Sequence, residues 1–275
     1  MRHPAANITI FDVLQSADTF VNRLQAIKAS IADIRWYPYN TISSLGFLST
    51  LTEGINIPAN AVLDLGAADG DISFLFADAG ASVDAFENAP SNINKGDGLR
   101  RLNDAFGKPL SLTFTDLDFG VIFPRDFYDL CFATGIAYHL RNPLLVYLNL
   151  AQHCRFMITN TRVIDIPPSD SRVKRAYWRI ASRLYRLQNR QNRETRFSRK
   201  PFAYLLDRRE INDDPTNYWL FTPAGYRRML KRCGWNILRE VSVGSSIGTL
   251  NSDKRLWALC ERVQNYADLK LHHDF

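Results

Sequence analysis

The sequence is poor in cysteine and has no long apolar run. Only four of its 275 residues are cysteines, and none forms a Cys-x-x-Cys pair. Each lies in or beside an apolar segment, so we expect buried, reduced thiols and no structural metal site. No apolar run approaches the roughly 18 residues that a membrane-spanning helix requires. The cysteines are Cys131, Cys154, Cys233 and Cys260.

The sequence also lacks internal repeats, low-complexity tracts and a recognisable secretory signal. Residues 1–7 do not form the apolar core of a signal peptide, so we expect a cytoplasmic protein. Hydrophobic residues make up 46% and charged residues 23% of the chain, as in ordinary globular proteins. This length and composition predict one large domain, or one domain with an elaboration.

Positive charge is concentrated in one segment. The chain carries a net charge of +6, but residues 172–200 hold eleven Lys or Arg and one acid, Glu194, which leaves the remainder net negative. Arginines recur there every three or four residues beside an apolar stripe, which predicts an amphipathic basic helix. The stripe comprises Val173, Tyr177, Ile180, Leu184 and Leu187. The arginines are Arg172, Arg175, Arg179, Arg183, Arg186, Arg190 and Arg193.

Two hydrophobic patterns divide the chain. Helical spacing before residue 60 gives way to strands that alternate with helices, which predicts a mainly parallel sheet with helices on both faces. The last two strands have no helix between them and predict an antiparallel pair at one edge. The predicted helices are 11–34, 42–51, 71–79, 98–106, 144–151 and 222–233. The predicted strands are 61–65, 82–87, 110–115, 128–133, 156–161, 235–243 and 255–260.

These patterns divide the chain into five parts. We predict an N-terminal helical cap at 1–60 and most of an α/β core at 61–164. A basic helical insertion at 165–214 separates this core from its C-terminal part at 215–264, and a tail follows at 265–275. Ligands of open α/β sheets lie beyond the carboxyl ends of the strands, so a site is expected in the loops after each strand.

The loop after the first core strand is rich in small residues. Residues 64–70 read Asp-Leu-Gly-Ala-Ala-Asp-Gly, and small side chains let a backbone turn sharply and approach a ligand. A dinucleotide site favours Gly-x-Gly-x-x-Gly, which Asp71 and Ala68 interrupt here. Asp69 would repel a pyrophosphate but suits a cationic ligand. The candidate ligand-binding residues are Asp64, Gly66, Ala67, Ala68 and Gly70.

Two further loops carry polar side chains. Glu87 lies 21 residues after Gly66, where a carboxylate can accept hydrogen bonds from ribose hydroxyls, and Asn88 follows it. Residues 134–143 contain the string Gly-x-x-Tyr-His-x-x-x-Pro. His139 has a reference pKa near neutrality, which suits a general base, and a structural hydrogen bond within the loop is the alternative.

Together these loops resemble the class I S-adenosylmethionine-dependent methyltransferases. The first loop is similar to their Asp-x-Gly-x-Gly-x-Gly motif, with Ala68 at the middle glycine. The Tyr-His loop, the aromatic turn at 36–39 and Asn-Tyr-Trp at 217–219 are similar to one branch of that family. This branch includes the tRNA wobble-uridine carboxymethyltransferases and uncharacterised bacterial relatives. The resemblance covers residues 35–165 and 215–262.

The resemblance implies a Rossmann-like fold with a seven-stranded, mostly parallel sheet and S-adenosylmethionine as cofactor. It places Asp116 at the adenine amino group, with the Leu117 backbone beside the ring, and it adds Thr134 to the cofactor site. Methyl transfer is an in-line displacement, so such an enzyme supplies chiefly positioning and a dry pocket. His139 is then the candidate base, and Tyr138 would orient the methionyl part of the cofactor or the incoming group.

The leading hypothesis is a cytoplasmic bacterial methyltransferase that acts on an oxygen or nitrogen of a small or lipid-linked metabolite. The residues expected to line the substrate side are Trp36, Tyr37, Arg141 and Arg162, the last either recognising an acidic group or simply solvated. The basic segment at 172–200 has three open interpretations: an RNA contact, a peripheral contact with a membrane surface or lipid, or a solvated lid.

Two other functions stay open at the level of sequence. One is tRNA modification by methyl or carboxymethyl transfer, for which Arg35 and Arg141 would supply the cations that an added carboxylate requires. The other is a non-catalytic binding module with a methyltransferase-like fold. The acidic residues Asp64, Glu87 and Asp116 argue against that module, because they suit a cofactor.

Overall fold

The computed structural model describes most of the chain. The basic helix predicted within 172–200 lies largely outside the described part, as does the predicted tail at 265–275. Within the described part, no helix is long and apolar enough to cross a bilayer. The described residues are 7–38, 41–165, 176–177, 180, 195–244 and 253–263.

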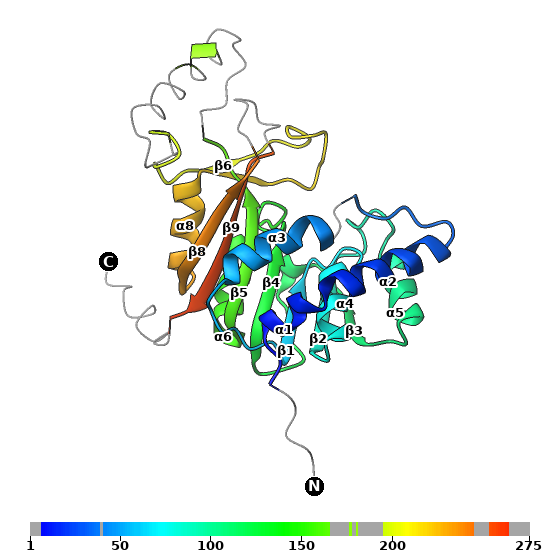
Figure 1. Ribbon diagram of the computed structural model, residues 1–275. Helices are drawn as coiled ribbons and strands as arrows, with labels where there is room; N and C mark the ends of the chain where they lie inside the picture. Colours follow the sequence, from blue (N-terminus) through cyan, green and yellow to red (C-terminus); the bar gives the residue numbers. More distant parts are fainter. Residues whose placement is uncertain are drawn as a thin grey trace.

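A seven-stranded sheet in the order β3-β2-β1-β4-β5-β9-β8 forms the centre of the protein (Figure 1). The first five strands run parallel, and β9 is antiparallel to both of its neighbours. The predicted fold class, including the antiparallel edge pair, is therefore confirmed. The strands are β1 (Ala61–Leu65), β2 (Ser82–Glu87), β3 (Leu110–Phe114), β4 (Tyr128–Thr134), β5 (Cys154–Arg162), β8 (Trp235–Val243) and β9 (Arg255–Arg262).

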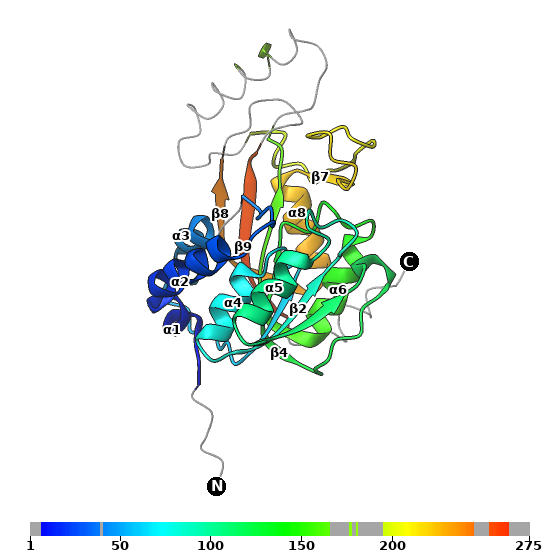
Figure 2. The same cartoon turned by 90° about the vertical axis from the view of Figure 1, so that its right-hand side faces the viewer.

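Helices cover both faces of the sheet, as Figure 2 shows. Buried side chains of α1 to α5 pack on one face, and those of α6 and α8 pack on the other. This arrangement buries every inner strand on both sides, which explains their nearly continuous apolar sequences. The helices are α1 (Ile10–Gln15), α2 (Ala17–Ser30), α3 (Thr41–Thr52), α4 (Asp71–Asp78), α5 (Asp97–Ala105), α6 (Pro143–His153) and α8 (Pro223–Arg232).

Successive residues of each strand alternate between the two apolar cores. On β4, Leu130 and Phe132 face the core beneath α1 to α5, whereas Cys131 and Ala133 face the core beneath α6 and α8. This is the period of two that a pleated strand imposes. All four cysteines are free and buried, and the expected burial is therefore confirmed.

The prediction of one continuous helix at 11–34 is wrong. Two helices occupy this region and break at Ser16, whose hydroxyl donates to the Val13 carbonyl, and the second ends before Ile31, which is extended. The hydrophobic spacing continued across the break because both helices pack on the same face. A hydroxyl that competes for backbone hydrogen bonds gives no signal in that spacing.

Two short strands were not predicted from the sequence. β6 (Ala203–Leu205) and β7 (Trp219–Phe221) pair antiparallel and form a small second sheet. A parallel bridge between Val163 and Phe221 joins β7 to the chain just beyond β5. Three-residue strands are too short for an alternating pattern to reveal them. Their position matters, because β7 brings residues 214–219 to the carboxyl edge of the main sheet.

The carboxylate of Asp84 predicts a measurable contribution to stability. It is buried on β2 and accepts hydrogen bonds from Arg125 Nε and from the hydroxyl of fully buried Tyr128, each at 2.8 Å. Asp84→Ala leaves both donors without this acceptor, so we expect the free energy of unfolding to fall by about 2 kcal/mol. Asp104→Ala, which breaks only an exposed pair with Lys108, should cost well under about 1 kcal/mol in the same denaturant titration. Equal losses would contradict this account.

Candidate functional site

The loop after β1 meets the loop after β4 at the carboxyl edge of the sheet. Gly66 has a left-handed backbone, with φ of +73°, and a Cβ atom there would lie 2.4 Å from Ile136 Cγ2. Only glycine fits this position. Ala68 also has a positive φ, +54°, which explains why the resembled motif carries glycine there. The turn therefore presents backbone and small side chains at the switch point, where the strand order reverses.

Two buried carboxylates lie beneath this loop. Glu87, at the end of β2, accepts a hydrogen bond of 2.7 Å from the Ala68 amide, and Asp64 accepts one of 2.5 Å from Ser73 Oγ. Burial raises the pKa of Glu87 to about 7 and that of Asp64 to about 6. Ionising these groups costs stability as pH rises through those values, so they suit a ligand that supplies hydroxyl donors or positive charge.

The N-terminal cap holds the same loop from outside. The Tyr37 amide donates to Asp69 Oδ2 at 2.7 Å, and the Tyr37 hydroxyl accepts from the Ile93 amide at 3.0 Å. Lys28 of α2 forms an ion pair of 2.6 Å with Asp71 and stacks over the Trp36 ring. Tyr37, expected on the substrate side, thus makes its contacts with the loops that follow β1 and β2. Trp36, also expected there, contacts α2 instead, where its Nε1 donates to the Lys28 carbonyl at 3.2 Å.

Asp116 begins a short 3₁₀ helix, Leu117–Phe119, after β3. Its carboxylate caps this helix by accepting a hydrogen bond of 3.0 Å from the Asp118 amide. Leu117 is buried. Arg141 lies 3.5 Å from the same carboxylate, and its Nε donates to the Tyr218 hydroxyl at 3.3 Å. The loops after β3 and β4 therefore share polar contacts at the sheet edge.

His139 is held by a segment far away in the sequence. Its Nδ1 lies 3.1 Å from the Thr216 carbonyl oxygen and 3.0 Å from Thr216 Oγ1, and that hydroxyl donates to Asp214 Oδ1 at 2.6 Å. A carbonyl can only accept, so Nδ1 carries the proton and Nε2 has the free lone pair. Burial lowers the pKa of His139 below its ordinary value of 6.5. The ring is thus a neutral base near physiological pH.

Tyr138 is buried beside His139, with ring centroids 4.1 Å apart. Its hydroxyl accepts from Arg255 Nη1 at 3.3 Å, and its carbonyl accepts from the Tyr218 amide at 2.7 Å. Arg162 ends β5 and is buried rather than solvated. Thr216, Asp214 and Arg255 were not among the candidates from the sequence. The nearest sequence signal is the string at 217–219, which leads into β7, a strand outside the main sheet (Figure 2).

The predicted cofactor and catalytic residues thus meet along one edge. The structure brings together the carboxyl ends of β1, β2, β3 and β4, and all of the candidates in the predicted loops lie there. Thr134 is the last residue of β4, and the Asn88 carbonyl accepts hydrogen bonds from Ser91 and Asn92 in the turn after β2. The arrangement can hold a ligand across the switch point, with a neutral histidine at one end.

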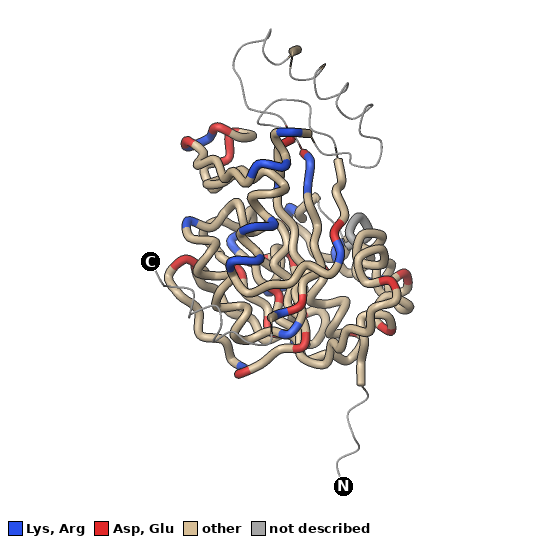
Figure 3. The backbone as a smooth tube through the Cα atoms, turned by 90° about the vertical axis from the view of Figure 1, so that its left-hand side faces the viewer, with Lys and Arg blue, Asp and Glu red and all other residues tan. Residues whose placement is uncertain are grey.

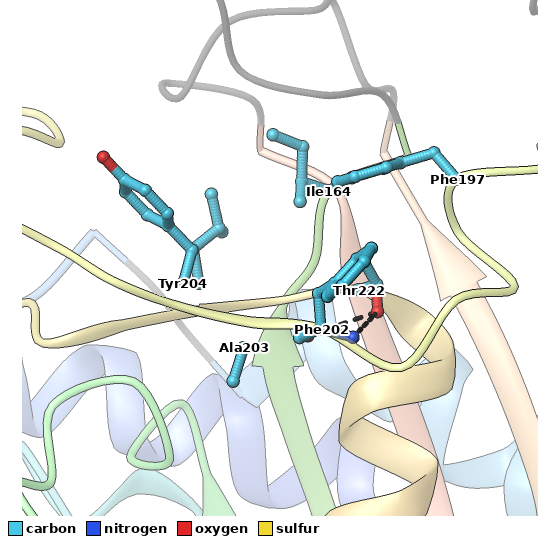
Figure 4. Close-up of a pocket in the computed structure, with 7 residues that line it drawn as sticks. Ile164, Phe197, Phe202, Ala203, Tyr204 and Thr222 are labelled. Atoms are coloured by element: carbon cyan, nitrogen blue, oxygen red, sulfur yellow. Dashed lines mark hydrogen bonds between the residues drawn. The ribbon is translucent and has the colours of Figure 1, made fainter.

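A small apolar pocket lies past the end of β5, between it and the β6–β7 sheet (Figure 4). Its volume is about 250 Å³, and its described lining is almost entirely apolar. Thr222 Oγ1 accepts a hydrogen bond from the Phe202 amide at 3.0 Å and fixes one wall. The lining residues are Ile164, Phe197, Phe202, Ala203, Tyr204, Leu220 and Thr222.

Comparison with known proteins supports the fold and leaves the reaction to be argued from the site. No protein-family model matches the sequence, and no curated protein matches it. Among solved structures, the chain is similar to the N-terminal domain of EvdMO1 with SAH bound, at 12% identity and a TM-score of 0.52, over 89% of this chain and 96% of that one.

Two other solved structures have comparable similarity. YcgJ from Bacillus subtilis is 12% identical with a TM-score of 0.51, over 81% of this chain and 99% of that one. The [4+2]-cyclase SpnF is 9% identical with a TM-score of 0.51, over 91% of this chain and 96% of that one. The chain therefore has the Rossmann-like methyltransferase fold. Because one neighbour is a cyclase, this fold does not by itself determine the reaction.

The contacts of His139 predict its titration. Asp214→Asn removes a negative charge that opposes the lowering of the His139 pKa, so that pKa should fall further below 6.5. Asp213→Asn, at an exposed neighbouring carboxylate, should leave it unchanged. Nitrogen NMR of the imidazole over a pH series measures both the pKa and the tautomer. A wild-type ring protonated on Nε2, or titrating above 6.5, would contradict the geometry.

Proposed function

We propose that this protein binds S-adenosylmethionine across the carboxyl ends of β1 to β4 and transfers its methyl group to an oxygen or nitrogen acceptor. The observation that carries the proposal is the convergence of buried Glu87, the small-residue loop and neutral His139 on one sheet edge. S-adenosylmethionine supplies a methyl group on a positively charged sulfur. A donor with this charge suits a site that has two buried carboxylates and whose first loop departs from the Gly-x-Gly-x-x-Gly motif of dinucleotide sites.

Several of the predicted cofactor residues have roles that their surroundings allow. Glu87 would accept hydrogen bonds from the ribose hydroxyls, a partnership that offsets the cost of its burial. The backbone from Gly66 to Gly70 would lie against the amino-acid part of the cofactor. Asp116 and Leu117, which lie just after β3, would contact the adenine. Tyr37 of the cap would close the site through its contacts with the loops after β1 and β2.

His139 and Tyr138 would act on the acceptor. With Nδ1 committed to Thr216, Nε2 of His139 is the atom that can take a proton from an acceptor hydroxyl or amine as the new bond forms. Tyr138, buried at the same edge and packed on His139, would orient the acceptor. Thr216 holds the imidazole in the required tautomer, and Asp214 holds Thr216, so these two are positioning residues.

A small or lipid-linked metabolite is the acceptor class that this edge favours. The apolar pocket beyond β5 can take an apolar part of such a molecule. Tyr177 and Ile180, the two described members of the predicted apolar stripe, are exposed, as a contact with lipid would require. The predicted RNA-modifying role would instead give tight tRNA binding that weakens steeply with salt, and a binding assay over a salt series separates the two.

Glu87 predicts how cofactor binding depends on pH. Only the ionised carboxylate accepts from both ribose hydroxyls, and burial raises the pKa of Glu87 to about 7. The affinity for S-adenosylmethionine and S-adenosylhomocysteine should therefore fall as pH drops below about 7, by up to tenfold per pH unit. Calorimetric titration of the purified protein at several pH values measures this.

The matched variant is Glu87→Gln. It should bind both compounds several-fold more weakly at pH 8 and lose the dependence near pH 7, because the amide does not titrate there. Glu53→Gln, an exposed acid before β1, serves as the control and should behave like the wild type. Failure of the wild-type protein to bind either compound would overturn the proposed enzyme and leave the fold intact.

A further inference from the structure

One face of the sheet changes from apolar to polar at its carboxyl edge. Along β4 and β5, the side chains that face α1 to α3 are apolar as far as Phe132 and Ile158. The next residues on that face are Thr134 on β4 and Asn160 on β5, which are partners in the register. Arg162 follows two residues later on the same face. This polar patch, Thr134, Asn160, Arg162 and Arg255, stands next to the Tyr-His loop.

Arg162 and Arg255 lie directly opposite each other in the antiparallel pairing of β5 and β9. Residues in such a pair project from the same face, and two like charges in this position repel each other. Both guanidinium groups approach one carboxylate oxygen, Asp253 Oδ1, at 3.7 Å and 3.5 Å. The Asp253 side chain is 77% exposed.

Asn160 supplies a second, independent observation. Its side chain is only 4% exposed, and its Oδ1 accepts no hydrogen bond from any residue that the structure describes. A buried amide oxygen without a donor costs free energy unless a ligand or water satisfies it. Asn160 lies between Thr134 on β4 and Trp257 on β9 in the register, one side-chain step below Arg162.

The patch adjoins the proposed catalytic residues. Arg255 donates from Nη1 to the Tyr138 hydroxyl. Gly135 has no side chain, and among the described residues a Cβ atom there would meet that hydroxyl at 3.7 Å and Arg255 Nη1 at 3.9 Å. A small group can therefore approach both the hydroxyl and the guanidinium. Burial is the main cause of the low pKa of His139, and the positive charges of Arg255 and Arg162 also help to lower it.

We propose that Arg162 and Arg255 bind an anionic group of the methyl acceptor, a carboxylate or a phosphate, while Asn160 accepts a hydrogen bond from the same molecule. The assignment of this anion to the methyl acceptor rests on the proposed function, but the anion site itself does not. Two guanidinium groups on one sheet face can bind the oxygens of one anion in the bidentate way that arginine favours. Figure 3 shows Lys and Arg positions interspersed with Asp and Glu positions at this end of the molecule.

The test is an anion titration of the full-length protein, first alone and then saturated with S-adenosylhomocysteine. The probes are acetate and inorganic phosphate, and the readout is the His139 pKa measured by NMR. An anion bound beside His139 should raise that pKa, because it offsets the two positive charges. Tighter binding of acetate assigns the site to a carboxylate, and tighter binding of phosphate assigns it to a phosphate.

Variants on the same strand pair make the test specific. Arg255→Gln should weaken the binding of the better probe by about tenfold or more, and Arg255→Lys, which keeps the charge but not the fork, by less. Arg155→Gln is the matched control, because Arg155 is also a β5 arginine that pairs with β9, through half-buried Glu261 at the opposite end of the strands. It should bind the probe like the wild type.

The outcomes separate this proposal from the methyltransferase assignment. If Arg255→Gln and Arg162→Gln bind the probes as the wild type does, or if neither probe shifts the His139 pKa, the anion site is wrong. Binding of S-adenosylhomocysteine by these variants reports that they are folded and that the cofactor half is intact. If the wild type binds anions but no S-adenosylhomocysteine, the anion site stands and the methyltransferase function fails.

Discussion

The meeting of the loops after β1 and β4 is the constraint on which the rest of the site depends. These strands are neighbours because the strand order reverses between them, so both loops emerge at one place. Gly66 must be glycine because Ile136 of the opposite loop fills the space of its side chain. That contact sets how close the small-residue turn comes to Tyr138 and His139. A larger residue at position 66 would separate the two halves of the site.

Charge divides the site along the sheet. Toward β2, the buried carboxylates of Glu87 and Asp64 have raised pKa values, so their ionisation lowers the stability of the folded protein. Toward β9, Arg162 and Arg255 stand on one face of the sheet. His139 lies between the two regions and is neutral, because burial lowers its pKa. A positively charged donor on one side and an anionic acceptor on the other would each meet the opposite charge, with a neutral base between them.

Elements outside the main sheet hold this arrangement in place. The N-terminal cap reaches the loop after β1 through Lys28 and the Tyr37 amide, which bind the acidic side chains at positions 71 and 69. On the far side, Thr216 and the β7 region fix His139 and the Tyr138 carbonyl. Both sets of contacts restrict the backbone freedom of the loops that form the proposed site. The proposed chemistry therefore depends on segments that contribute few groups to it directly.

Local pattern in the sequence determined the seven main strands, the helices that alternate with them, and the loops where Glu87, Asp116 and His139 stand. Periodicity and turn residues carry that information because each depends on residues only a few positions apart. The break at Ser16, the short strands β6 and β7, the partner of His139 and the pairing of Arg162 with Arg255 came only from the tertiary structure. Those features join residues that are distant in the chain. They depend on the strand register and on how connecting segments fold back onto the sheet, and no local spacing in the sequence encodes either.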